Sequence, residues 1–186
     1  MKSKTLYSIL ALVCMFFLQT ATLHAQESKK FTDNAFVSVD FTAGFKSHSN
    51  IPWSVGAEFS YNVVAGLSVL ARYEEAFAMN TSTDTYKYSN LLGGGLSYDF
   101  FHGLKPEADG SRDKFSLKVY GGSSLGGGSK VWKQNFVSAG LEYEFRPKPQ
   151  SVYPYLGIGY RYSKSKDYYN GMPNMHIAAV TLGFRF

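Results

Sequence analysis

The sequence predicts an all-β protein: an eight-stranded, antiparallel, up-and-down transmembrane β-barrel preceded by a cleavable signal peptide. Three observations support this prediction. The first is a series of segments in which apolar side chains alternate with small or polar ones, which is the period of a β-strand. The second is a short apolar segment directly after a basic N-terminus. The third is the amphipathic ending of the chain, residues 180–186, which finishes on Phe186.

The N-terminal segment has the features of a secretory signal. Lys2 and Lys4 precede a mostly apolar run over residues 6–18, and residues 20–25 lead to a predicted cleavage before Gln26. The apolar run is too short to cross a bilayer as a helix, which needs about 20 residues. The alternative interpretation is an uncleaved N-terminal anchor.

Cys14 is the only cysteine, and it lies inside the apolar run. Because Val13 precedes it and further apolar residues follow it, the segment does not predict a lipid-anchored protein. Cleavage leaves a chain without cysteine, and therefore without disulfides or thiol chemistry. The predicted organisation is a signal peptide over residues 1–25, a short lead over 26–34 and one barrel domain over 35–186.

Eight segments of about ten residues show the strand period. In the first segment, Val37, Val39 and Phe41 lie on one face, and Ser38 and Asp40 lie on the other. An even number of strands fits a closed antiparallel meander, and the lengths match the roughly 9–11 residues that a tilted membrane strand needs. The predicted strands cover residues 37–45, 53–63, 67–75, 88–100, 114–123, 135–146, 153–163 and 175–186.

The connections fit the usual polarity of such barrels, with the N-terminus on the periplasmic side. Short inward turns and longer, polar outward loops alternate, although the first outward loop is short and the second inward turn is long and charged. The short turns are predicted at residues 64–66 and 147–152, and the long loops at residues 75–87, 125–134 and 164–174.

Alternation alone does not say which face points outward. A soluble, lipocalin-like barrel would place its apolar face inside, around a small ligand. The opposite arrangement is favoured because strand glycines such as Gly56 and Gly183 lie on the polar face, where small residues leave room for large charged ones. Aromatic residues such as Trp53 and Phe184 also recur near segment ends on the apolar face, where they suit the two interfaces of a bilayer.

The polar face predicts a closed lumen filled by charged side chains. Eight strands enclose an interior only wide enough for side chains. Carboxylates and guanidiniums of opposite sign can satisfy one another there by bidentate hydrogen bonds. The predicted lumen charge network consists of Asp40, Glu58, Arg72, Glu74, Asp99, Lys118, Glu142, Glu144, Arg146, Arg161 and Arg185.

The eight segments and the ending Gly183-Phe184-Arg185-Phe186 resemble the small outer-membrane β-barrel proteins of Gram-negative bacteria. The similar group is the OmpA/OmpX-like barrels, and particularly the Bacteroidetes-type outer-membrane β-barrel domains. The resemblance implies localisation in the cell outer membrane, among outer-membrane lipids and lipopolysaccharide. It also implies periplasmic chaperones and the β-barrel assembly machinery as partners during biogenesis, with Gly183, Phe184 and Phe186 as the insertion signal.

The sequence predicts no enzyme and no catalytic, cofactor or metal site. The glycine-rich residues 121–130 lack the lysine that directly follows the last glycine of a phosphate loop. Glu142 and Glu144 share a face as paired carboxylates do, but arginines on that face favour salt bridges. His176 has no serine nearby, whereas the lipid A deacylases among small barrels place a histidine and a serine together. The net charge is +5, and the charged residues are scattered along the chain rather than clustered, which indicates no nucleic-acid partner.

Three functional hypotheses remain from the sequence. The first is a structural or surface-interaction protein of the envelope, with any extracellular ligand bound by loops at residues 80–85, 130–133 and 164–169. The second is a narrow pore gated by rearrangement of Glu58, Arg72, Glu142 and Arg161. The third is a lipid-modifying enzyme that uses His176.

Overall fold

The computed structural model describes residues 34–45, 50–64, 66–80, 85–101, 112–126, 128–129, 132–146, 152–166 and 173–186. The chain divides into two units, Met1–Ala35 and Phe36–Phe186, and the second unit contains the barrel. The predicted signal peptide, its cleavage site, and all of the predicted lead except Asn34 lie outside the described residues.

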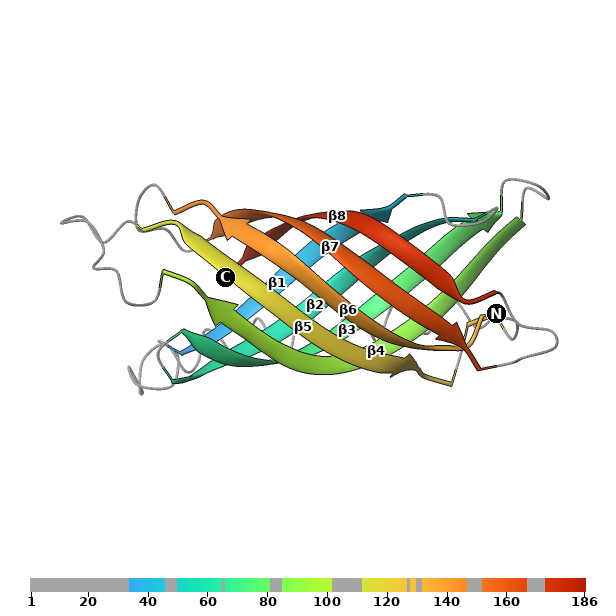
Figure 1. The fold of residues 1–186 in the computed structure, drawn as a ribbon, viewed down its shortest axis with the longest axis horizontal. Coiled ribbons are helices and arrows are strands. Elements are labelled where there is room, and N and C mark those ends of the chain that lie inside the picture. The colour runs from blue at the N-terminus through green and yellow to red at the C-terminus, as the bar shows by residue number, and fades with distance from the viewer. Residues whose placement is uncertain are drawn as a thin grey trace. The chain divides into compact units, whose positions relative to one another are not determined.

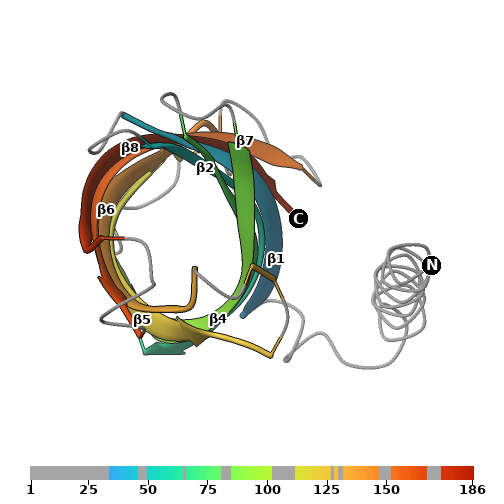
Figure 2. The same cartoon turned by 90° about the vertical axis from the view of Figure 1, so that its right-hand side faces the viewer.

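Eight strands follow one another around a closed antiparallel barrel (Figures 1 and 2). The first and last strands close it, because Val39 pairs with Phe184 and Phe41 pairs with Leu182. Closure gives every strand a neighbour on both sides and removes the unpaired edges that an apolar environment does not tolerate. The strands are β1 (Ala35–Gly44), β2 (Asn50–Val64), β3 (Leu67–Asn80), β4 (Thr85–Asp99), β5 (Lys114–Ser124), β6 (Gln134–Glu144), β7 (Tyr153–Ser165) and β8 (Met175–Arg185).

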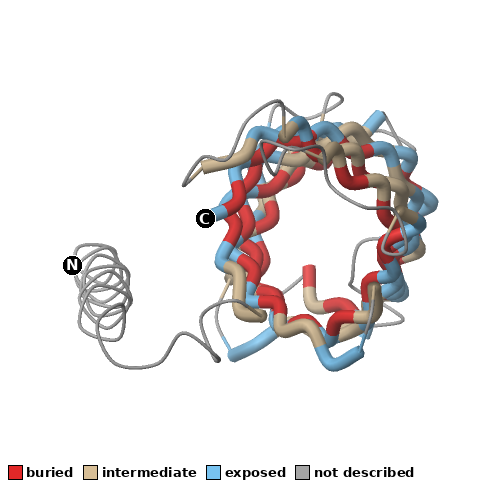
Figure 3. The backbone as a smooth tube through the Cα atoms, turned by 90° about the vertical axis from the view of Figure 1, so that its left-hand side faces the viewer, coloured by how far each residue is buried: buried red, intermediate tan, exposed pale blue. Residues whose placement is uncertain are grey.

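Each strand has one buried and one exposed face, and the two alternate along the chain (Figure 3). In β2, Val55 is 49% exposed while Glu58, three residues later, is 2% exposed. The outer surface of the barrel is therefore apolar, and the lumen holds the charges. This arrangement confirms the orientation that the glycine and charge patterns predict, and it is the reverse of a lipocalin-like barrel.

β3 and β4 are longer than predicted, and the predicted outward loop at residues 75–87 is wrong over most of its length. β3 continues to Asn80, and β4 already begins at Thr85. The alternation of apolar and polar side chains disappears near the end of β3, because both faces of the strand are apolar there. Ala78 is completely buried inside, while Phe77 stacks on Trp53 outside, with ring centroids 4.2 Å apart and planes 16° from parallel. The other strand ends differ from the prediction by three residues or fewer.

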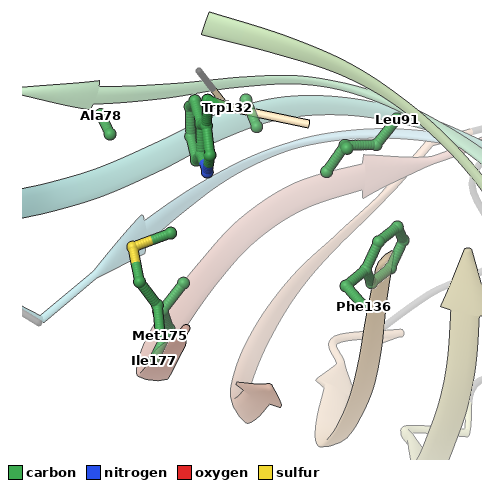
Figure 4. Packing of buried hydrophobic residues seen from close by; sticks show 7 residues of the cluster. Ala78, Leu91, Trp132, Phe136, Met175 and Ile177 are labelled. Carbon is green, nitrogen blue, oxygen red and sulfur yellow. The ribbon is translucent and has the colours of Figure 1, made fainter. Parts of the chain in front are cut away.

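The lumen has two zones along the barrel axis. We call the end formed by Ala35 and Arg185 the first rim, and the end formed by Gly44 and Met175 the second rim. Charged side chains fill the lumen from its middle to the first rim. Towards the second rim lies an apolar cluster (Figure 4), which consists of Ala76, Ala78, Leu91, Trp132, Phe136, Met175 and Ile177.

Candidate functional site: the lumen

Arg72 lies at the centre of one half of the charge network. Its guanidinium forms a bidentate pair with Asp40, with both Nη–Oδ distances at 2.6 Å, and its Nε donates to Glu74 Oε1 at 2.5 Å. The arginine and both carboxylates are buried. Such fork-shaped, charge-assisted contacts fix the geometry of both partners.

Arg161 carries the network across the barrel. Its Nη1 lies 2.8 Å from Glu74 Oε2, and its Nη2 donates to the Tyr120 hydroxyl at 2.9 Å. The guanidinium also lies 4.6 Å from the centre of the Phe136 ring, at the boundary with the apolar cluster. Because β7 and β3 are four strands apart in a closed sheet of eight, this pair joins opposite walls.

Lys118 and Arg185 organise the other half of the network. The Lys118 ammonium lies 2.6 Å from Glu58 and 2.8 Å from Glu142. Arg185 lies 3.2 Å from Glu142 and 2.5 Å from Glu144. The two halves meet where Arg72 Nη1 lies 3.6 Å from Glu58 Oε2.

Two predicted members of the network lie at its margin near the first rim. Arg146 pairs with Glu144 and lies over the Tyr153 ring at 4.6 Å. Asp99 pairs with Arg112 at 3.0 Å, in the connection before β5. Arg112 has no place in the sequence prediction because it lies within the charged turn at residues 101–113, where alternation assigns no face.

Tyr155 is a lumen residue that the predicted charge network does not include, although its position in β7 places it on the same face as Arg161. It is 2% exposed, its hydroxyl donates to Asp40 at 2.8 Å, and its ring faces the cations Lys118 and Arg185. The period of two thus predicts its face. The register, with Tyr155 opposite Gly183, adds which neighbour leaves room for its ring.

Two glycines make room for these large side chains. A Cβ atom at Gly183 would stand 2.6 Å from Cε1 of the Tyr155 ring. A Cβ atom at Gly56 would stand 2.8 Å from the Arg72 guanidinium carbon and 3.0 Å from Asp40 Oδ1. Gly56 thus leaves space for charged side chains, as predicted, whereas Gly183 leaves space for the Tyr155 ring.

The predicted insertion signal lies at the seam of the barrel. Phe184 and Phe186 point outward and are half exposed, whereas Gly183 faces the lumen. The Phe186 backbone N–H donates to the Val37 carbonyl at 2.8 Å, so the last residue is held against β1.

Outside the strands, Asp113 connects the β5 and β6 ends at the first rim. The hydrogen bonds that it accepts from the Tyr143 hydroxyl and from the Arg146 backbone N–H hold the pKa of this carboxyl below its usual value. Both bonds favour the ionised form.

His176 lies on the outer face of β8, against Tyr160 and Tyr162. Its Nδ1 is hydrogen-bonded to the Tyr160 hydroxyl, and the Tyr162 ring centre lies 5.0 Å away. The other two histidines that follow the predicted cleavage site, His48 and His102, lie outside the described residues. Within the described ranges, no group of histidine, cysteine, aspartate and glutamate could hold a metal ion, and no helix is long and apolar enough to cross a membrane.

The proposed recognition loops are only partly described. Asn80 and Thr85 belong to paired strands, and residues 81–84, 130–131 and 167–169 lie outside the described residues. The prediction that residues 130–133 form a surface loop is wrong for Trp132, whose side chain turns into the lumen and which is 3% exposed. Its indole thereby completes the apolar cluster.

A cavity lies between the charge network and the apolar cluster. The space open to the centre of a water molecule measures about 70 Å³. Lys118, Glu142 and Arg161 line its charged side, and Trp132 and Ile177 line its apolar side.

No protein-family model matches the chain, and no curated protein matches it. Among solved structures, Neisserial surface protein A is similar with a TM-score of 0.51 and 21% identity, over 81% of this chain and 95% of that one. The N-terminal β-barrel domain of Pseudomonas aeruginosa OprF has a TM-score of 0.44 and 12% identity, covering 81% and 97%. The Yersinia pestis outer membrane protein Ail has a TM-score of 0.47 and 14% identity, covering 82% and 99%. The chain has the eight-stranded barrel fold of small outer-membrane proteins.

Proposed function

We propose that the protein is an integral outer-membrane barrel of structural or surface-interaction type whose lumen is closed. The observation that carries this proposal is the ion pair between Arg161 and Glu74, which joins opposite walls of the barrel. An open pore needs a continuous water path along its axis. In this lumen, buried side chains from opposite walls meet in the middle of that path.

The outer surface supports the membrane assignment. Large apolar side chains such as Val55, Ile158 and Leu182 are about half exposed, which is unfavourable in water and favourable in lipid. Outer-membrane lipids and lipopolysaccharide are therefore the proposed surroundings. The outward Phe184 and Phe186 support recognition of the last strand by the β-barrel assembly machinery, after delivery by periplasmic chaperones.

Fractionation of cells that express the full chain tests the membrane assignment. We expect the protein in the outer-membrane fraction, with heat-dependent migration on a gel because the closed barrel resists unfolding by detergent. Recovery in the soluble periplasmic fraction without heat-dependent migration would contradict it.

We further propose that the barrel is not an enzyme. The only described histidine, His176, contacts tyrosine rings rather than a nucleophile–acid pair. Expression should therefore leave the mass of lipid A unchanged. A change in lipid A mass that disappears in His176→Ala would restore the hypothesis of a lipid-modifying enzyme.

A further inference from the structure

Three buried polar atoms at the cavity between the charge network and the apolar cluster have no hydrogen-bond partner among the described residues. They are Trp132 Nε1, Gln134 Oε1 and Ser163 Oγ. All three residues line the cavity and are 2–3% exposed. A buried polar group without a partner is unfavourable by about 1–3 kcal/mol. The three atoms together therefore indicate that a hydrogen-bonding molecule occupies this space.

The charged side of the cavity offers no free charge to such a molecule. Lys118 is held between Glu58 and Glu142 at 2.6 and 2.8 Å, and Arg161 is paired with Glu74. Each of these cavity-lining charges is thus already neutralised by an opposite charge. A charged ligand would disturb these pairs, whereas a neutral ligand would not.

The three unpartnered atoms offer a mixed set of contacts. The Trp132 indole N–H donates, the Gln134 carbonyl oxygen accepts, and the Ser163 hydroxyl does both. Hydroxyl groups match all three because each can donate and accept. Ile177 and Ala179 also line the cavity, and their apolar side chains suit a short carbon chain.

We propose that this cavity is a binding site for a small neutral polyol. About 70 Å³ of space open to water centres exceeds what one water needs, roughly 10–15 Å³ by this measure. The same space accepts a chain of a few carbons with hydroxyl groups. Figure 4 shows the Trp132 ring projecting into the lumen among Leu91, Met175 and Ile177, which places its N–H inside the barrel.

The two tryptophans provide an internal test. Both tryptophans are among the residues that line the cavity, but only the Trp132 ring turns into the lumen, whereas the Trp53 ring lies on the outer face and stacks on Phe77. In detergent micelles, the full-length barrel labelled with ¹⁵N should show two indole N–H resonances, which Trp53→Phe assigns. Titration with glycerol should shift the Trp132 resonance in a saturable manner and leave Trp53 unchanged. Glycerol 3-phosphate should produce no saturable shift, because the cavity excludes a net charge.

Variants of the cavity residues test which side chains bind glycerol. Ser163→Ala and Gln134→Met should each weaken glycerol binding by up to about tenfold, since each removes one hydrogen bond. Ser89→Ala is the matched control: Ser89 Oγ is also buried without a partner among the described residues, but Ser89 does not line this cavity. It should bind glycerol as the wild type does.

Four results would overturn the proposal. They are an absent or non-saturable shift, equal shifts of both indoles, equal affinity in all the variants, and magnetisation transfer to the Trp132 N–H from water alone at saturating glycerol. The last result would show a cavity that holds water only.

Discussion

Nη1 of Arg161 in β7 lies 2.8 Å from Oε2 of Glu74 in β3, on the opposite wall of the barrel. The same carboxylate also receives Arg72 Nε at 2.5 Å. Glu74 therefore forms ion pairs with two arginines, Arg72 and Arg161. The carboxylate partner of Arg161 is Glu74. This asymmetry decides which substitution should be the more damaging.

Glu74→Gln should destabilise the barrel by about 3–5 kcal/mol, because it leaves two buried guanidiniums with one carboxylate fewer. Arg161→Met should destabilise it less, by roughly 1–3 kcal/mol, because Glu74 keeps Arg72 as a partner. The measurement is the free energy of unfolding in urea, for the barrel folded in lipid vesicles.

Glu75→Gln is the matched control for this pair. Glu75 is the next residue along β3 and lies on the outer face, so its loss should change the free energy of unfolding by about 0.5 kcal/mol or less. Equal effects at positions 74 and 75 would show that the lumen pair contributes nothing specific.

Gly56→Ala should destabilise the barrel by about 1–3 kcal/mol, because the new methyl group would press on the guanidinium of Arg72 and on Asp40. Gly94→Ala provides the comparison. Gly94 is exposed on the outer face, and the nearest atom to an added Cβ is the Leu70 carbonyl oxygen at 3.4 Å. This substitution should be neutral or slightly stabilising, since glycine weakens a strand. Urea midpoints that fall equally for both variants would contradict the packing argument.

Asp113 should give the barrel an acid-sensitive contribution to stability. Its folded pKa lies below its unfolded pKa. The contribution is therefore fully present above the unfolded value of about 3.9 and is lost as the pH falls through the folded value. The difference in urea midpoint between wild type and Asp113→Asn should shrink as the pH falls from 6 to 2. A difference that stays constant over this range would exclude the predicted linkage.

The sequence predicts the fold where the two faces of a strand differ in polarity. In β2, Val55 and Phe59 alternate with Gly56 and Glu58, and both the strand and its orientation follow from that contrast. Near the second rim the contrast disappears, because the lumen itself becomes apolar. The sequence of residues 76–79 therefore resembles the start of a loop, although these residues belong to β3 and pair with β2.

The details of the site depend on register, which composition does not encode. Alternation places Arg72, Glu74 and Arg161 on the lumen face, and the up-and-down order places their strands on opposite walls, but neither says which residues lie at the same level along the barrel axis. The inward turn of Trp132 has no signal in the sequence either, since a single aromatic residue before a strand fits a loop equally well. Local patterns thus predict faces, and only the closed sheet determines contacts.

The closed lumen is the central claim, and conductance in planar lipid bilayers tests it most directly. With the purified full-length barrel inserted, we expect no discrete current steps, because Arg161 and Glu74 join opposite walls and the proposed closed lumen leaves ions no path. Discrete, reproducible steps from the wild-type protein would contradict a closed lumen and support the narrow-pore hypothesis instead.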